Sequence, residues 1–270
     1  MNMNEYFLES RGIYYRTNEW SEGRPTIVFV HGLVGSSSAW KAFEEYFAQS
    51  CNVLTYDLRG HGKSTKPLTY DAYAIREHVQ DLRELIQVLG ATKCTLVSHS
   101  FGTLIALEYI ALYMDTLSHI VFLSPSFSLS KIPKTRIVKP LYEIAAPLMR
   151  LIPFSGRVHG QTDYTKYIAS GDWNVARTIA DMRNTGLHVY FYSMAHVYDI
   201  DREDLLSLIT LPVLLIHGKH DGMFPYENSI IMAKKIPNAR LVTLPDADHI
   251  IVLNNAPEIC VEIAQLVHTS

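Results

Sequence analysis

The chain has 270 residues, of which 48% are hydrophobic and 19% charged, and its formal net charge is −3. This composition is typical of a soluble globular protein, and the length suits one large α/β domain. The negative charge argues against a nucleic-acid-binding protein, and no apolar run approaches the ~18 residues that span a bilayer. The N-terminal residues lack the basic start and apolar stretch of a secretory signal, so we expect a cytoplasmic protein.

The three cysteines, Cys51, Cys94 and Cys260, have no CxxC spacing of the kind found in zinc sites or redox motifs. Cys94 lies within an apolar run, and Cys51 directly precedes one. We therefore expect buried, reduced thiols and no disulfide framework.

Strand-like and helical segments alternate along most of the chain. The first expected elements are a hairpin (5–9 and 12–18), a buried strand (26–30), a helical stretch (38–48), a strand (52–56), an amphipathic helix (71–89) and a strand (94–98). An apolar helix (103–114), strands at 119–124, 211–218 and 239–245, and helices at 226–236 and 255–267 follow. Because parallel strands need crossover connections, this alternation predicts an α/β fold with a doubly wound, mostly parallel sheet.

The interval from about 127 to 207 interrupts the alternation. It has no clear strand, but it holds several helical stretches, several prolines and many aromatic residues. An irregular connection of this length is uncommon in a compact domain. We therefore expect a core domain formed by residues 1–126 and 208–270, with residues 127–207 inserted as a helical cap.

The sequence Ser-His-Ser-Phe-Gly at 98–102 joins an expected strand to an expected helix. A sharp strand-to-helix turn exposes a serine hydroxyl, and the N–H groups at the helix start can stabilise an oxyanion. Such a turn needs small residues two positions before and after the nucleophile, here Ser98 and Gly102, although glycine is usual at both. An isolated Ser100 could equally be a helix N-cap, but the buried elements on either side favour a nucleophile.

The sequence VHGLVGS (30–36) follows the strand at 26–30. Its His-Gly turn leaves the backbone N–H of Leu33 free to point to the same place as the N–H of Phe101. Two convergent amides of this kind form an oxyanion hole. The alternative interpretation of 30–36 is a plain glycine turn.

Asp221 and His249 each follow an expected strand on the same sheet edge as Ser100. A carboxylate can hold an imidazole in one tautomer, and the imidazole can then take the proton of the serine hydroxyl. The order Ser, Asp, His, each on a loop after a strand, predicts a catalytic triad.

Two other interpretations of the loop around Asp221 remain. His217, His220 and Asp221 could form a metal cluster, but their spacing on a turn is poor for three ligands. Asp221 could also simply initiate a turn before Gly222. We expect no metal and no cofactor.

Five segments share a pattern: VHGLVGSSSAW (30–40), YDLRGHGKS (56–64), SHSFG (98–102), LLIHGKHDGMFP (214–225) and LPDADHIIVLNNAPEI (244–259). Together they resemble the α/β-hydrolase fold superfamily over essentially the whole chain. The resemblance implies Ser100 as nucleophile, Asp221 as acid and His249 as base, with the amides of Leu33 and Phe101 as oxyanion hole. Dehalogenases and epoxide hydrolases of this fold use an aspartate nucleophile, so a serine favours acyl transfer.

The polar loop 57–64 is expected to brace the site through an Arg–carboxylate network.

The expected reaction is hydrolysis of a carboxylic ester, or a related acyl bond, through an acyl-enzyme on Ser100. The cap has an amphipathic, aromatic set of residues, formed by the segment 188–196 with Phe127, Leu148, Met149 and Trp173. Packing between cap helices is the default interpretation. The alternative is that they line the pocket, which would suit a small-molecule substrate with an apolar acyl or aromatic group. Related folds use the same triad in thioesterases, lactonases and C–C bond hydrolases. Some relatives instead capture a signal molecule for a protein partner.

The cap also has a basic cluster, formed by Lys131, Lys134, Arg136 and Lys139. Such a cluster is usually a solvated face. It could alternatively receive an acidic carrier of the acyl group, such as an acyl-carrier protein or a coenzyme A ester.

Overall fold

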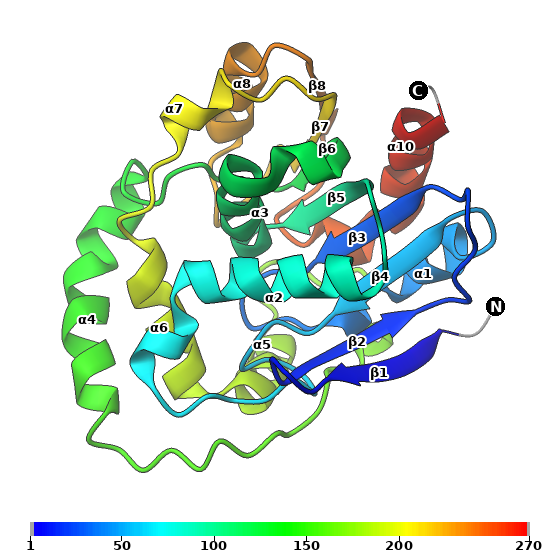
Figure 1. Cartoon of the computed structure of the whole chain (residues 1–270). Helices are drawn as coiled ribbons and strands as arrows, with labels where there is room; N and C mark the ends of the chain where they lie inside the picture. The colour runs from blue at the N-terminus through cyan, green and yellow to red at the C-terminus, as the bar shows by residue number, and fades with distance from the viewer. Residues whose placement is uncertain (1–2, 269–270) are drawn as a thin grey trace.

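An eight-stranded sheet forms the centre of the computed structural model, which describes residues 3–268 except the side chains of residues 133 and 134 (Figure 1). Its strands are β1 (Asn4–Leu8), β2 (Ile13–Thr17), β3 (Thr26–Val30), β4 (Asn52–Tyr56), β5 (Cys94–His99), β6 (Leu117–Leu123), β7 (Val213–Gly218) and β8 (Ala239–Leu244). They lie in the order β1-β2-β4-β3-β5-β6-β7-β8.

The sheet is antiparallel only at the end formed by the N-terminal hairpin. β1 pairs with β2 and β2 with β4 in antiparallel fashion, and every later pair is parallel. The predicted mostly parallel sheet is therefore confirmed. The carboxyl ends of β3, β5, β7 and β8 consequently meet at one edge, beside the point where the strand order reverses around β3.

β3 explains why the centre of the sheet is apolar on both faces. Its sequence, Thr-Ile-Val-Phe-Val, is β-branched or aromatic throughout, and all five residues are buried. It pairs with β4 on one side and β5 on the other, so no edge of the strand is exposed. Residues of this type fit the pleated surface of a strand that is covered on both faces.

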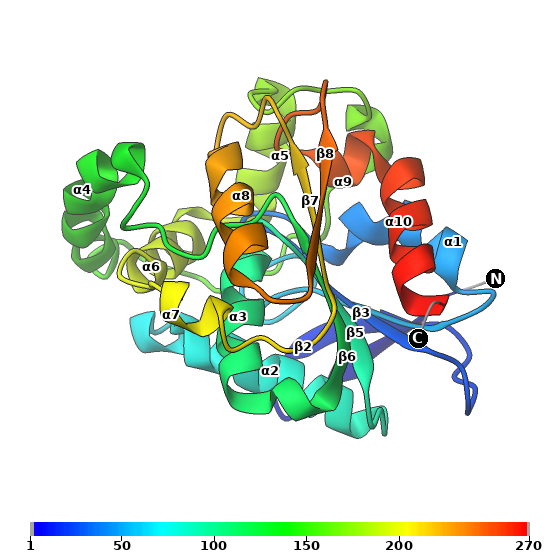
Figure 2. The same ribbon diagram turned by 90° about the horizontal axis from the view of Figure 1, so that it is seen from above.

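Helices cover both faces of the sheet, as a doubly wound fold requires. They are α1 (Lys41–Phe47), α9 (Ile251–Asn254) and α10 (Ala256–His268) on one face, and α2 (Ile75–Val88), α3 (Phe101–Tyr113) and α8 (Tyr226–Lys235) on the other (Figure 2). Two separate apolar cores result, one under each group of helices. α3 is apolar nearly all round because it lies between β5 and α2.

Between β6 and β7 the chain forms further helices. They are α4 (Pro133–Met149), α5 (Val175–Thr185), α6 (Leu187–Val197) and the short α7 (Glu203–Leu206). α6 packs against α4 and α5, and α4 stands at the side of the molecule (Figures 1 and 2). The division into a core domain and an inserted cap over residues 127–207 remains a prediction, and this segment is called the cap below.

The loop after β4 contains the expected Arg–carboxylate network, with its carboxylate on α2. Nε and Nη2 of Arg59 donate to Asp81 at 2.7 and 2.6 Å, and Nε of Arg11 donates to the same carboxylate at 2.8 Å. Asp57 instead accepts the backbone N–H groups of Ser37 and Lys63 at 2.6 and 2.7 Å. These contacts fix the loop under the carboxyl edge of the sheet.

All three cysteines are buried and free. No helix within residues 3–268 is both long enough and apolar enough to cross a lipid bilayer.

Truncation of Phe29 tests how much the apolar core under α1 contributes to the stability of the fold. Its ring is fully buried, with centroids 5.0 Å from Trp40 and 5.7 Å from Phe43. We expect Phe29→Ala to lower the free energy of unfolding by about 3–5 kcal/mol, because the truncation leaves a cavity. Denaturant unfolding measures the change. Tyr46→Ala, at a side chain that is 47% exposed, is the control; equal losses in the two variants would contradict the expectation.

Candidate active site

Ser100 is at the turn between β5 and α3, where the backbone is strained. It has φ 53° and ψ −120°, a conformation that costs a non-glycine residue about 1–3 kcal/mol. Its N–H donates to the carbonyl of Leu123 at 3.1 Å, and its carbonyl accepts the N–H of Thr103 at 2.8 Å. The turn therefore presents the hydroxyl at the carboxyl edge of the sheet.

The close contacts of this turn explain its small residues. A Cβ on Gly102 would lie only 2.7 Å from the carbonyl oxygen of Val30 and 2.8 Å from that of His31. Ser98 is fully buried, and its hydroxyl donates to the carbonyl of Val121 at 3.4 Å. A serine is accommodated at 98 because its hydroxyl has a partner on the next strand.

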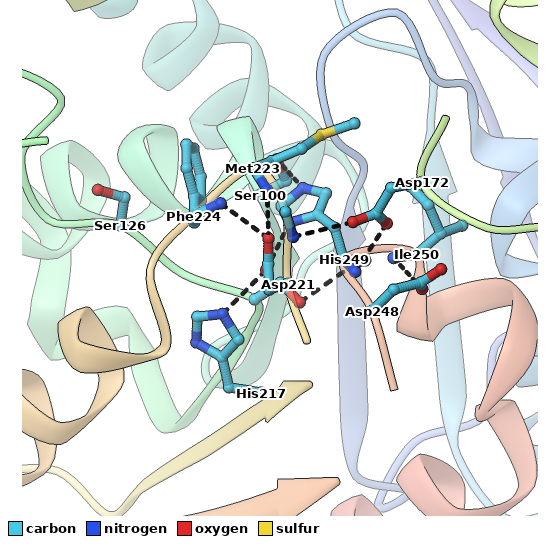
Figure 3. A network of polar contacts seen from close by, with 12 residues as sticks. Ser100, Ser126, Asp172, His217, Asp221, Met223, Phe224, Asp248, His249 and Ile250 are labelled. Carbon is cyan, nitrogen blue, oxygen red and sulfur yellow. Dashed lines mark hydrogen bonds and ion pairs between the residues drawn. The ribbon is translucent and has the colours of Figure 1, made fainter. Parts of the chain in front are cut away.

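The structure brings Ser100, His249 and Asp221 together in one hydrogen-bonded chain (Figure 3). The hydroxyl of Ser100 donates to Nε2 of His249 at 2.8 Å, and Nδ1 of His249 donates to Oδ2 of Asp221 at 2.7 Å. This network assigns the proton of the neutral imidazole to Nδ1 and leaves Nε2 as an acceptor. Such an arrangement can move a proton from the hydroxyl to the imidazole.

The carboxylate of Asp221 is buried and accepts four hydrogen bonds. Besides His249, Nε2 of His217 donates to Oδ2 at 2.9 Å, and the N–H groups of Met223 and Phe224 donate to Oδ1 at 2.8 and 2.7 Å. Burial alone would raise the pKa of Asp221, but the hydrogen bonds from His217 and His249 lower it well below its usual value. The carboxylate is therefore ionised beside His249.

His217 orients the carboxylate of Asp221 and is itself held by the hydroxyl of Ser229, 2.7 Å from Nδ1. His220, the other histidine of this loop, is exposed. Within residues 3–268 there is no group of three or more His, Cys, Asp or Glu side chains arranged to hold a metal ion.

Leu33 and Phe101 lie beside Ser100 in the wall of one cavity. Among the described residues, the backbone N–H of neither one donates to another protein group. The loop of Leu33 is fixed by His31, whose Nδ1 donates to the carbonyl of Gly32 at 2.7 Å and whose Nε2 accepts the N–H of Leu58 at 2.9 Å. Burial lowers the pKa of His31 to about 4, so this ring is neutral near pH 7.

The backbone carbonyl of His249 is held by two residues that the sequence motifs do not identify. Nε2 of His99 donates to it at 3.0 Å, and the hydroxyl of Ser124 donates at 3.2 Å. Burial lowers the pKa of His99 to about 3 and keeps this ring neutral. His99 directly precedes Ser100 in the sequence. Its hydrogen bond therefore joins the backbone of His249 to the residue next to Ser100.

A cavity of ≈ 550 Å³ opens over Ser100 and His249. Its wall is mainly apolar and includes Leu33, Leu104, Leu129, Trp173, Met182, Leu187, Tyr190, Phe191, Met194, Met223 and Phe224. The aromatic segment 188–196 has both expected roles, because Tyr190, Phe191 and Met194 line the cavity while Val189 and Tyr192 are buried in the packing of the cap.

Three other apolar cap residues singled out in the sequence do not line this cavity. Phe127 is buried, Leu148 is half exposed on α4, and Met149 lines a separate groove.

Acidic neighbours partly neutralise the basic cluster of the cap. Lys131 pairs with Asp201 and Glu203, and Lys139 pairs with Asp199 and Glu143. Arg136 is exposed, and the side chain of Lys134 lies outside the described residues. The acidic carrier remains a prediction.

Comparison with known proteins agrees with the fold. The family model described as "alpha/beta hydrolase fold" matches residues 25–256. The chain is an α/β hydrolase. A putative carbamate hydrolase of Pseudomonas savastanoi pv. phaseolicola is 28% identical over 233 residues, which cover 83% of this α/β hydrolase and 86% of the relative.

Two solved structures have the same fold as this hydrolase. One is an N-acyl homoserine lactone degrading enzyme, with a TM-score of 0.74 and 24% identity over 94% of this chain and 96% of that chain. The other is a thermophilic esterase from Thermogutta terrifontis, with a TM-score of 0.73 and 22% identity over 98% and 97% of the two chains.

His217 provides a test of how the hydrolase stabilises the Asp221 carboxylate. We expect His217→Phe to lower the free energy of unfolding at pH 7 by about 2 kcal/mol, because a buried charge loses one donor. A lowered carboxyl pKa stabilises the fold above the unfolded-state pKa, and this contribution disappears as the pH falls. The difference from wild type should therefore narrow below about pH 4.

Urea unfolding at several pH values measures this difference, and His220→Phe at the exposed neighbour is the matched control. Equal stabilities of the two variants at pH 7 would exclude the stabilising role of His217.

Proposed function

We propose that this α/β hydrolase cleaves carboxylic esters through an acyl-enzyme on Ser100, with His249 as general base and Asp221 as its partner. The observation that carries the proposal is the continuous hydrogen-bonded chain of these three side chains, with contacts of 2.8 and 2.7 Å. Its open end is the hydroxyl of Ser100, which lines the apolar cavity.

The first step is attack of the Ser100 oxygen on the acyl carbonyl. A serine hydroxyl is a weak nucleophile, so His249 removes its proton at Nε2 as the new C–O bond forms. The imidazolium then faces the ionised carboxylate of Asp221, which stabilises the charge and keeps the ring in position.

The tetrahedral intermediate has a negatively charged oxygen. The N–H groups of Leu33 and Phe101 are the proposed donors, since both lie beside Ser100 and neither has another partner in residues 3–268. One such donor contributes about 3 kcal/mol to the stabilisation of a transition state.

Breakdown of this intermediate releases the alcohol, which takes the proton held by His249. The acyl group stays on Ser100 as an ester. His249 then removes a proton from water, the water oxygen attacks the acyl carbonyl, and Ser100 leaves with the proton from His249. Ester and water are thus converted to acid and alcohol.

The cavity supports a small-molecule substrate with an apolar acyl or aromatic group. Leucine, methionine and aromatic side chains form most of its wall, and such surfaces bind hydrocarbon better than polar groups. The relatives act on lactones or esters, or are named as carbamate hydrolases. The group that leaves the acyl carbonyl therefore has to be tested separately from the acyl group. Thioester, lactone and C–C bond cleavage, and capture of a signal molecule, remain alternative uses of the same triad.

Labelling with a small fluorophosphonate probe tests the nucleophile. We expect the wild type to be labelled, Ser100→Ala not to be labelled, and His249→Ala and Asp221→Asn to react about 10³-fold or more slowly, because the hydroxyl then lacks its base or the correct tautomer. In-gel fluorescence measures the rates. Undiminished labelling of Ser100→Ala would refute the assignment, and Ser50→Ala, at an exposed serine, is the control.

Turnover of p-nitrophenyl esters of increasing acyl length tests the reaction and the cavity. We expect many turnovers per protein, which a sensor that stalls after one event would not give. Each added methylene should raise kcat/KM about fourfold until the cavity is full, since burying a methylene contributes about 0.8 kcal/mol. A lactone and a carbamate extend the series to other leaving groups.

Met194→Trp narrows the cavity from the cap side and should shift the preference to shorter acyl groups. Leu112→Trp makes a similar change at a side chain on α3 that is 61% exposed, and it should leave the preference unchanged. If kcat/KM does not depend on acyl length in the wild type or in either variant, the cavity does not bind the acyl group.

A further inference from the structure

Asp172 is a buried carboxylate of the segment between β6 and β7, and it contacts both loops that carry the proposed acid and base. Its Oδ1 accepts the backbone N–H of His249 at 2.8 Å, and its Oδ2 accepts the backbone N–H of Gly222 at 3.0 Å (Figure 3). Gly222 directly follows Asp221. One side chain therefore bridges the loop after β7 and the loop after β8.

The carboxylate of Asp172 can approach the backbone at position 222 because this residue is a glycine. A Cβ on Gly222 would lie 3.2 Å from Oδ2 of Asp172 and 3.3 Å from Nε1 of Trp173, so a larger residue there would crowd the bridge. On the other side, Nη2 of Arg177 donates to the backbone carbonyl of Asp172 at 2.7 Å. Asn174 caps α5 by accepting the N–H of Arg177 at 2.9 Å. The start of α5 thus fixes where Asp172 lies.

A second anchor holds the same segment a few residues earlier. The side chain of Asn254 on α9 accepts the N–H of Ala169 at 2.9 Å and donates to the carbonyl of Ser170 at 3.0 Å. Asn254 does not contact Asp221 or His249 through any hydrogen bond among the described residues. The chain therefore offers one contact that only docks the segment and one that docks it onto the triad loops.

The backbone of His249 is consequently held from two directions. His99 and Ser124 hold its carbonyl from the core, and Asp172 holds its N–H from the segment that covers the cavity. Trp173, the next residue, lines the cavity, so the segment that carries Asp172 is also part of the substrate-binding wall. If the segment lifts, the N–H groups of His249 and Gly222 both lose a charged acceptor at the same moment.

We infer that Asp172 is a positioning residue that couples docking of the segment 169–174 to the alignment of Asp221 and His249. The inference rests on the proposed function for its kinetic consequences. The triad is fully aligned only while the segment covers the cavity, because the two loops are joined by the Asp172 carboxylate only then. Asp172 also lines the cavity, but its positioning role acts through the backbone N–H groups of His249 and Gly222.

The kinetic test compares Asp172→Ala and Asp172→Asn with wild type. We expect Asp172→Ala to lower both the rate of labelling by a small fluorophosphonate and kcat for p-nitrophenyl acetate about 10- to 100-fold, as small misplacements of catalytic groups do. KM for this small ester should change little, since its acyl group does not need the cavity wall. Asp172→Asn should be intermediate, because its amide oxygen can still accept one N–H.

Two control variants separate positioning from general damage to the cap. Asn254→Ala removes the neighbouring anchor and leaves the Asp172 bridge, and Asp163→Ala removes an exposed cap carboxylate whose hydrogen bonds go to Thr165. Asp163→Ala should label at close to the wild-type rate. Asn254→Ala, which weakens docking of the segment but keeps the bridge, should lose clearly less than Asp172→Ala. An Asn254→Ala variant that loses as much as Asp172→Ala, or an Asp172→Ala variant that labels like wild type, would overturn the inference.

Amide hydrogen exchange gives a readout that does not depend on catalytic activity. Peptides that cover 218–224 and 245–252 should exchange faster in Asp172→Ala and Asp172→Asn than in Asn254→Ala, while peptides of β3 and β5 stay protected in all variants. Unchanged exchange in both loops would refute the bridge, even if the wild type does not react with the probe. Absence of labelling in the wild type together with faster exchange in the Asp172 variants would instead contradict only the proposed function.

Discussion

The buried carboxylate of Asp221 is the constraint on which the rest of the site depends. A charge removed from water needs several hydrogen-bond donors, and this one receives four, from two imidazoles and two backbone N–H groups. These donors fix the loop after β7 and the ring of His249 together. The orientation of the imidazole, and through it the hydrogen bond to Ser100, follows from satisfying one buried charge.

The fold supplies the places from which these groups converge. Parallel strands bring their carboxyl ends to one edge of the sheet. Pairing of the strands therefore makes the loops after them neighbours, although the residues of these loops are far apart in sequence. A second set of buried rings, including His31 and His99, then ties the surrounding loops through the N–H of Leu58 and the carbonyl of His249. Burial keeps these two rings neutral near pH 7, so they add hydrogen bonds to the site without adding charge.

The sequence predicts the parts of the molecule that depend on local pattern. The β-branched run of β3, the apolar helix α3 and the polar residues after each strand indicate the sheet and bring Ser100, Asp221 and His249 to one edge. The contact of Asp172 with His249 could not be predicted, because it spans 77 positions and no motif surrounds Asp172. The contact between His217 and Asp221 could not be predicted either. A histidine close to an aspartate in sequence is compatible with a metal site and with a hydrogen bond, and only the orientation of the rings distinguishes the two.

The backbone at Ser100 has a consequence for the protein as a whole. Its positive φ is a conformation that glycine adopts at no steric cost, whereas a side chain at this position stores strain in the folded state. The residue that makes the turn chemically useful is therefore not the one that makes it most stable. Thermostability and the proposed reactivity are opposed at this position, and selection for resistance to heat alone would favour glycine and remove the proposed nucleophile.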